Sequence, residues 1–133
     1  MKKILLLMTL LTALVSAQTL EQFAQKHHYE TDFDVALQKA EKAHKPLFFV
    51  MVTNYCPWCR KYEKRTLSDA KVDALIHQRY IPLILNREKG KFPEQFKTPI
   101  VPVTYIVNHR DGSIVKKEMG YKGKKDLIET LEK

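Results

Sequence analysis

Several absences limit what this chain of 133 residues can be. It has only two cysteines, Cys56 and Cys59, which excludes a scaffold held together by several disulfide bridges. It has no apolar stretch of about 20 residues, the length that a transmembrane helix needs. It also has no internal repeat and no low-complexity tract. The chain is therefore predicted to fold around a single core.

Acidic residues are in the minority. Fifteen Asp and Glu stand against 23 Lys and Arg, which gives a formal net charge of +8 at pH 7. The basic residues are scattered along the sequence, and no nucleic-acid-binding motif accompanies them. We therefore expect a solvated basic surface and no nucleic-acid partner.

The N-terminal segment has the pattern of a secretory signal peptide. Lys2 and Lys3 precede an apolar run from Ile4 to Val15, and the small-residue sequence Val15-Ser16-Ala17 follows. We expect cleavage after Ala17, a periplasmic location, and a mature protein that is not embedded in the membrane. The alternative is an uncleaved helix that anchors the chain.

An unbroken apolar run from Leu47 to Val52 is the strongest secondary-structure signal. Its β-branched and aromatic residues indicate a strand buried on both faces. Because such a strand needs a covering layer on each side, an α/β fold is predicted. The other expected strands are 80–85, 103–107 and 114–118, the last two joined by a hairpin at Asp111-Gly112. The expected helices are 20–28, 34–44, a polar stretch after Cys59, one capped by Ser68-Asp69 that ends near Arg79, and 125–131.

The second expected strand is less regular than the first. Its Pro82 has no backbone N–H, which indicates that part of this strand is not fully paired. Residues 86–97 are expected to form a polar connection.

The sequence Cys56-Pro57-Trp58-Cys59 lies between the first strand and the start of a helix. Unpaired N–H groups at a helix N-terminus favour an anion, so the pKa of the Cys56 thiol is expected to fall from about 8.5 into roughly the 3.5 to 7.5 range. Residues three apart share a helix face, which lets Cys59 form a disulfide with Cys56. Pro57 suits the first helical turn, where its missing N–H costs nothing.

Other side chains near the cysteines have two interpretations each. Tyr55 and Trp58 dock an extended substrate segment or pack against the helix. Glu63, one turn after Cys59, receives the Cys59 proton through water or is a surface glutamate paired with a basic neighbour. Four basic residues follow on the same helix, namely Arg60, Lys61, Lys64 and Arg65. Most are expected to be solvated, although a side chain that folds back towards the site would stabilise a thiolate.

The chain from 34 to 133 resembles the thioredoxin superfamily, in particular the exported thioredoxin-related proteins of bacteria. The resemblance rests on the strand 47–52, the Cys56–Cys59 motif, Val101-Pro102, the Asp111-Gly112 hairpin and Gly120, which occur in thioredoxin order. It implies a thioredoxin-like fold with a central four-stranded mixed sheet flanked by helices. The expected division is a signal peptide at 1–17, a helical extension at 18–33 and the thioredoxin-like domain at 34–133.

The resemblance also implies a site. Pro102 is expected to be a cis-proline beside the dithiol, with Pro99 a weaker candidate, and the Val101 backbone is expected to bind substrate. The sequence departs from the family at two points: Val50 stands near the place of a buried acidic residue, and Tyr55 replaces a tryptophan. The expected substrate-binding residues are Tyr55, Pro57, Trp58, Val101 and Pro102.

The expected function is periplasmic reduction of protein disulfides, with Cys56 as nucleophile and Cys59 as resolving cysteine. The expected partners are disulfide-containing proteins and a membrane electron donor or other redox partner, and the expected cofactor is none beyond the Cys56–Cys59 disulfide itself. A thiol oxidase or isomerase of the same fold remains an alternative, because the motif does not define the direction of exchange.

Two interpretations of the cysteine pair that do not involve disulfide exchange also remain. In one, Cys56 and Cys59 join histidines in a zinc or copper site without redox turnover. In the other, the two cysteines form an inert structural disulfide, although so small a ring stabilises little. Covalent haem attachment is excluded because Arg60 occupies the position where that motif needs histidine.

Overall fold

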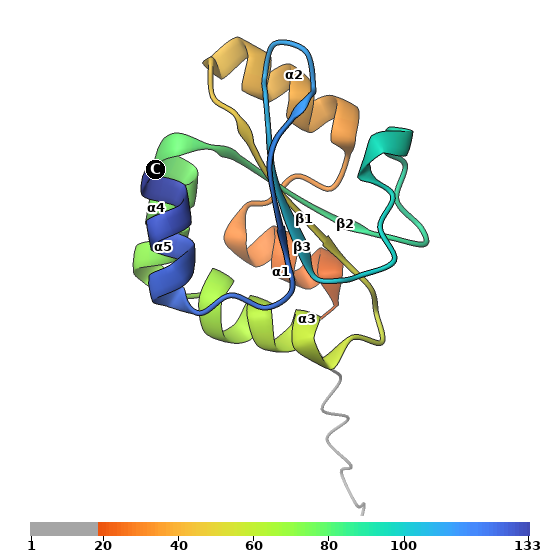
Figure 1. Ribbon diagram of the computed structural model, residues 1–133, viewed down its shortest axis with the longest axis vertical. Coiled ribbons are helices and arrows are strands. Elements are labelled where there is room, and N and C mark those ends of the chain that lie inside the picture. The colour runs from red at the N-terminus through yellow and green to blue at the C-terminus, as the bar shows by residue number, and fades with distance from the viewer. Residues whose placement is uncertain (1–18) are drawn as a thin grey trace, which may run out of the picture.

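The computed structural model describes residues 19–133, so the predicted signal peptide and its cleavage site lie outside the described residues. Within that range no helix is both long and apolar enough to cross a membrane. Figure 1 shows the elements, which are in chain order α1 (Leu20–His27), α2 (Phe33–Ala43), β1 (Leu47–Val52), α3 (Pro57–Tyr62), the π-helix η1 (Glu63–Leu67), α4 (Ala70–Arg79), β2 (Ile81–Asn86), the 3-10 helix η2 (Glu94–Phe96), β3 (Val103–Val107), β4 (Ile114–Met119) and α5 (Lys124–Glu132).

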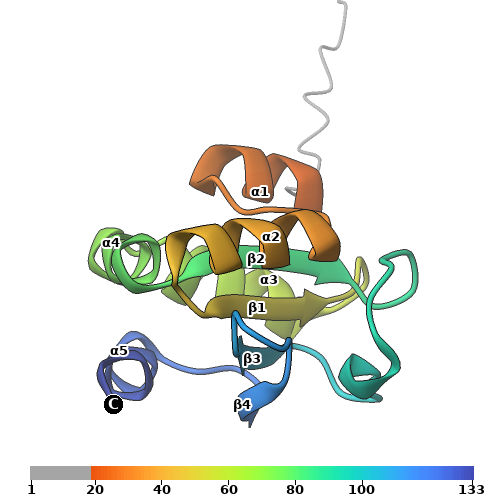
Figure 2. The same cartoon turned by 90° about the horizontal axis from the view of Figure 1, so that it is seen from above.

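The four strands form one mixed sheet in the order β2-β1-β3-β4. β1 is parallel to β2 and antiparallel to β3, and β3 is antiparallel to β4. Figure 2 shows the strands in this order, with α1 and α2 nearest to β2. The predicted four-stranded mixed sheet is confirmed, and each predicted strand agrees with an observed one to within a residue at either end.

Strand β1 is buried along its whole length, as its apolar sequence predicts. Phe48, Val50 and Val52 point to a core cluster that includes residues of α1, α3, α4 and α5. Leu47, Phe49 and Met51 point to the opposite cluster, which α2 and η2 cover. Because side chains alternate along a strand, an unbroken apolar run supplies both faces of the sheet at once. This arrangement confirms the predicted α/β fold.

Side-chain caps define where several helices begin. Thr19 and Gln22 form a capping box at the start of α1. Asp32 caps α2, and Asp69 caps α4 by accepting a hydrogen bond from the Val72 N–H at 3.2 Å. Of the predicted cap Ser68-Asp69, it is therefore the aspartate that acts.

Helix α1 packs into the core of the domain. Leu20, Phe23 and Ala24 are buried in the same cluster as Phe48 of β1. The segment after α1 also reaches the sheet, because the Glu30 N–H donates to the Pro82 carbonyl at 2.9 Å. Pro82 lies in the edge strand β2, which agrees with its missing donor. The predicted boundary between residues 33 and 34 stays a prediction, and it falls inside α2.

The predicted polar connection between β2 and β3 also contributes to the core, which its composition did not indicate. Phe96 in η2 is fully buried. Its ring centroid lies 5.2 Å from those of Phe33 and Phe49 and 5.1 Å from that of Tyr105. The stretch has two aromatic residues, Phe92 and Phe96, which are too few to form a periodic pattern, so only the packing reveals its role.

A buried hydrogen bond ties the dithiol helix to the sheet. The hydroxyl groups of Tyr62 in α3 and Thr104 in β3 lie 2.9 Å apart, and both residues are buried. Polar groups removed from water need such partners, because an unpaired buried hydroxyl is costly.

Replacement of Tyr62 by phenylalanine is expected to lower the free energy of unfolding by about 1–3 kcal/mol, because the Thr104 hydroxyl stays buried without its partner. Urea denaturation measures the change. The matched control is Tyr55→Phe, which makes the same chemical change at a side chain that is 98% exposed and should alter stability by less than about 0.5 kcal/mol. Equal stability of the two variants would contradict the assigned role.

Candidate active site

Cys56 and Cys59 form a disulfide at the N-terminus of α3, with their Cα atoms 5.1 Å apart. Cys56 is the N-cap residue and is partly exposed, whereas Cys59 is fully buried. The backbone N–H of Cys59 donates to Cys56 Sγ at 3.0 Å. The same donor would favour a negative charge on Cys56 in the reduced protein. Strand, cysteines and helix follow one another as the sequence predicts.

The segment Val101-Pro102 lies next to the disulfide although it is more than 40 residues away in the sequence. The peptide bond between these two residues is cis. The Val101 carbonyl oxygen lies 3.8 Å from Cys56 Sγ. The Gly120 N–H donates to the Pro102 carbonyl at 2.8 Å, and the backbone of Gly120 has a φ of +85°, which favours glycine.

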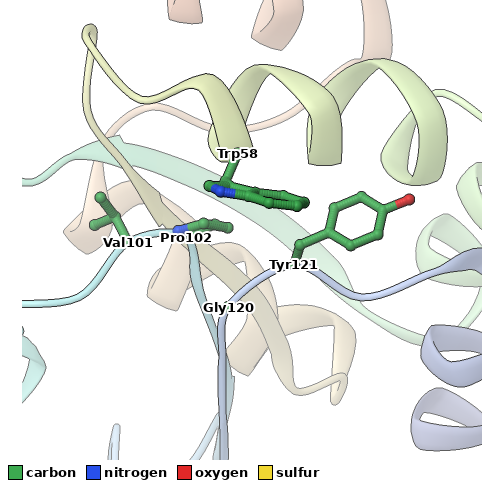
Figure 3. A pocket seen from close by; sticks show the side chains of 5 residues that line it. All are labelled: Trp58, Val101, Pro102, Gly120 and Tyr121. Atoms are coloured by element: carbon green, nitrogen blue, oxygen red, sulfur yellow. The ribbon is translucent and has the colours of Figure 1, made fainter.

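A cavity of about 420 Å³ opens beside this segment. Figure 3 shows the Trp58 indole extending from α3 towards Pro102 and Tyr121. The ring centroids of Trp58 and Tyr121 lie 5.8 Å apart, and Trp58 remains 54% exposed. Trp58 therefore packs on one side, as one interpretation predicts, and faces solvent on the other, where the docking of a substrate segment stays a prediction. The residues that line the cavity are Trp58, Val101, Pro102, Gly120 and Tyr121.

The cavity contains three of the five predicted substrate-binding residues. Trp58, Val101 and Pro102 line it, whereas Tyr55 and Pro57 do not. Tyr55 is almost fully exposed beside Cys56 in the sequence, so it does not pack against the helix. Sequence reasoning missed Tyr121, because nothing in the sequence indicates that the segment after β4 returns to the cysteines.

Two of the four basic residues on α3 and η1 fold back towards the site. The Lys61 ammonium lies 4.4 Å from the centroid of the Trp58 ring and 5.2 Å from that of Tyr121. Arg60 donates to the Thr53 carbonyl at 3.1 Å. Lys64 and Arg65 are exposed, as predicted for most of this group.

Glu63 is buried, so the interpretation as a surface glutamate was wrong. Its relative exposure is 4%, and its Oε2 lies 2.7 Å from Arg60 Nε. The pairing with a basic neighbour was therefore foreseen, but the burial was not. Its Oε1 has no hydrogen-bond partner among the described residues. Burial raises the pKa of Glu63 to about 7, although the positive charge of Arg60 partly opposes this shift.

The five histidines lie away from the dithiol. His27 and His77 contact Asp73 between α1 and α4, at 3.9 Å and 3.6 Å. His28 and His44 are left-handed C-cap residues, and the His109 ring lies 6.1 Å from that of His44. Within residues 19–133, no group of three or more His, Cys, Asp or Glu side chains is arranged to hold a metal ion. Nothing in this geometry joins the two cysteines to histidines.

The buried carboxyl group of Glu63 should make stability depend on pH. Because its pKa is raised from 4.5 to about 7 in the folded protein, the folded state holds this proton more tightly, and the free energy of unfolding falls as pH rises across that window. Glu63→Gln removes the effect. Measured by urea denaturation, the free energy of unfolding of the variant relative to that of wild type should rise by at most about 3 kcal/mol between pH 4 and pH 8.

The control for this measurement is Glu94→Gln, since the Glu94 side chain is 81% exposed. Its stability should follow that of wild type at every pH. A Glu63→Gln curve that also stays parallel to wild type would contradict the raised pKa.

Comparisons with known proteins agree with this geometry. A family model described as thioredoxin-like matches residues 28–109, which is more than half of the chain. A comparison with curated protein sequences finds no match.

Solved structures similar to this one include a thioredoxin from Thermus thermophilus, with a TM-score of 0.66 and 18% identity over 77% of this chain and 82% of that one. The oxidised C-terminal domain of DsbD from Neisseria meningitidis has a TM-score of 0.63 and 20% identity over 78% of this chain and 97% of that one. A disulphide isomerase from Xylella fastidiosa Temecula1 has a TM-score of 0.52 and 27% identity over 63% of this chain and 68% of that one. With its family match, its mixed sheet and its Cys56–Cys59 disulfide, the chain belongs to the thioredoxin superfamily.

Proposed function

We propose that this protein is a periplasmic thiol-disulfide oxidoreductase that reduces disulfides in other proteins through Cys56 and Cys59. One observation carries the proposal. A partly exposed sulfur at a helix N-terminus accepts the Cys59 N–H at 3.0 Å and lies 3.8 Å from the Val101 carbonyl oxygen. A thiolate at Cys56 is thus stabilised and can be reached by a substrate, whereas Cys59 is shielded.

In the first step the Cys56 thiolate attacks one sulfur of a substrate disulfide. A bond forms between Cys56 Sγ and that sulfur, and the substrate disulfide breaks, so that the other substrate sulfur leaves as a thiolate. In the second step Cys59 loses its proton and attacks Cys56 Sγ. The Cys56–Cys59 disulfide forms and the second substrate thiolate leaves. The dithiol loses two electrons, which the substrate gains.

The cavity beside Pro102 supports the docking of an extended substrate segment. The half-buried Val101 borders Cys56, with its carbonyl oxygen 3.8 Å from Cys56 Sγ, and an extended substrate chain would pair with its backbone. Trp58 and Tyr121 supply an apolar wall, and the Lys61 ammonium above both rings adds a positive charge at its rim. This arrangement suits a segment with an apolar or acidic side chain near its cysteine.

The direction of exchange and the location are inferred from less direct evidence. The apolar segment at 4–15 followed by Val15-Ser16-Ala17 supports export. The resemblance implies that strongly oxidising members of the superfamily often have a histidine between the two cysteines and a large helical insertion. This chain has no histidine between Cys56 and Cys59, and only Ser68 and Asp69 separate η1 from α4. Both features favour a reductase. A reductase needs a donor that renews its dithiol, and in the periplasm we expect a membrane electron donor.

Substitution of each cysteine tests the exchange mechanism. Cys59→Ser should accumulate mixed disulfides with substrate proteins, because the step that releases them is blocked. Cys56→Ser should capture none and should reduce insulin at the background rate with dithiothreitol as donor. Electrophoresis of each variant without reductant shows the captured species, and added reductant should release them. Failure of both variants to capture partners from a periplasmic extract would count against the proposed exchange.

The reduction potential of the pair tests the direction. A reductase should have a potential close to that of thioredoxin, about −270 mV, whereas a potential near −120 mV would indicate an oxidase. Equilibration with glutathione buffers, followed by trapping of free thiols, measures the ratio of dithiol to disulfide. A value at the oxidising end would favour the oxidase or isomerase alternative.

A further inference from the structure

The second exchange step requires Cys59 to lose a proton, although the residue is fully buried. A general base within hydrogen-bond reach, directly or through one water, accelerates such a transfer. Strand β1 offers no acid at the position where the resemblance would place one, because Val50 is buried among apolar side chains. The base must therefore come from another element.

We propose that Glu63 is the group that receives the Cys59 proton when Cys59 attacks the mixed disulfide. This inference rests on the proposed function, because it concerns a step of that reaction. Glu63 is the only carboxylate in α3 and η1, and three of its properties suit this role. It is buried, it follows Cys59 by one helical turn, and one of its oxygens has no partner.

The helix places the two side chains on one face. The Glu63 N–H donates to the Cys59 and Arg60 carbonyls, so helical geometry continues from α3 into η1. Side chains four residues apart in such a segment are neighbours, with Cβ atoms about 5–6 Å apart. Cys59 is 0% and Glu63 is 4% exposed, so both point into the domain. The π-helix then begins at Glu63, and π-helical turns of this kind occur frequently at functional sites.

The oxygens of Glu63 differ in their surroundings. Oε2 lies 2.7 Å from Arg60 Nε, and Arg60 is itself held by its hydrogen bond to the Thr53 carbonyl at the end of β1. Oε1 is buried without a partner among the described residues. The ion pair therefore holds the carboxylate in place while one oxygen stays available for a proton.

Other titratable groups surround the carboxylate. Tyr29 is buried, with 6% of its surface exposed, and its hydroxyl also lacks a partner within the described part of the chain. Burial first, then the charges of Tyr62, Asp73 and Glu63, raise the pKa of Tyr29, so it stays neutral. Among residues 19–133, Arg60 is the one cation that acts on Glu63 directly. Desolvation raises the pKa of Glu63 to about 7, which suits a base that works near neutral pH.

The proton transfer balances as follows. The Cys59 thiol gives its proton to a Glu63 oxygen, which leaves a thiolate and a neutral carboxylic acid. The thiolate attacks Cys56 Sγ, the Cys56–Cys59 bond forms, and the bond between Cys56 and the substrate breaks. The substrate sulfur leaves with the electron pair of that bond. Glu63 later returns its proton to solvent or to the leaving thiolate.

Single-turnover kinetics with 5,5'-dithiobis(2-nitrobenzoic acid) separates the two steps. When the reduced protein meets one equivalent of this reagent, attack by Cys56 releases the first chromophore and attack by Cys59 releases the second. In Glu63→Gln the second phase should slow about 100-fold or more near pH 7, since a general base is lost. The first phase should stay within about twofold of wild type. The deficit should shrink at high pH, where hydroxide replaces the missing base.

Two further variants separate a proton-transfer role from a structural one. Glu63→Asp keeps a carboxylate and should recover part of the second-phase rate that Glu63→Gln loses. Glu94→Gln removes an exposed carboxylate that pairs only with Lys97 and should match wild type in both phases. If Glu63→Gln does not fold, the wild-type profile decides, because its second phase should level off near pH 7.

The outcomes are distinct for the two proposals. A second phase of Glu63→Gln equal to wild type, or a wild-type second phase that rises without a break through pH 7, would overturn the role of Glu63. Equal slowing of both phases at every pH would also overturn it. If the wild-type protein released no second chromophore at all, the exchange mechanism itself would fail.

Discussion

The site depends on the burial of β1 between two layers. This strand pairs with β2 on one side and β3 on the other, and its six side chains supply apolar surface to both faces of the sheet. A strand held on four sides cannot shift its register without moving every side chain to the wrong face. Because Met51 pairs with Val103, the residue before Val103 is held beside the segment that follows β1. The proximity of Pro102 to Cys56 follows from this register.

Helix α3, which contains Cys59, and the π-helix η1 that continues it have two different faces. Trp58 and Lys61 face the cavity, where their contacts with Tyr121 form one wall of the opening. Cys59, Tyr62 and Glu63 face the interior, where Tyr62 is tied to β3 by its hydrogen bond to Thr104. Substrate contact and proton transfer would thus occur on opposite sides of one short helix. The ion pair between Arg60 and Glu63 lies between them, anchored to the end of β1.

The family match and the cavity do not cover the same part of the chain. The thioredoxin-like match ends at residue 109, before β4 begins. Gly120 and Tyr121, which complete the cavity, lie beyond it. The dithiol and the cis peptide bond therefore belong to the region that matches the family, whereas the aromatic contact opposite Trp58 comes from the C-terminal part.

The amino-acid sequence alone determined the four strands, the α-helices and the dithiol, but not the short helices η1 and η2. An unbroken apolar run, helical spacing and the Asp111-Gly112 turn are local signals, and they predicted all four strands and the position of Cys56 at a helix N-terminus. The resemblance to the superfamily implied that Pro102 lies beside the dithiol, but only the tertiary structure decided the other contacts between distant residues. The burial of Glu63 and Phe96 and the return of Tyr121 to Trp58 depend on packing between segments far apart in sequence. A charged or isolated aromatic residue carries no periodic pattern, so its environment is known only when the layers around it are assembled.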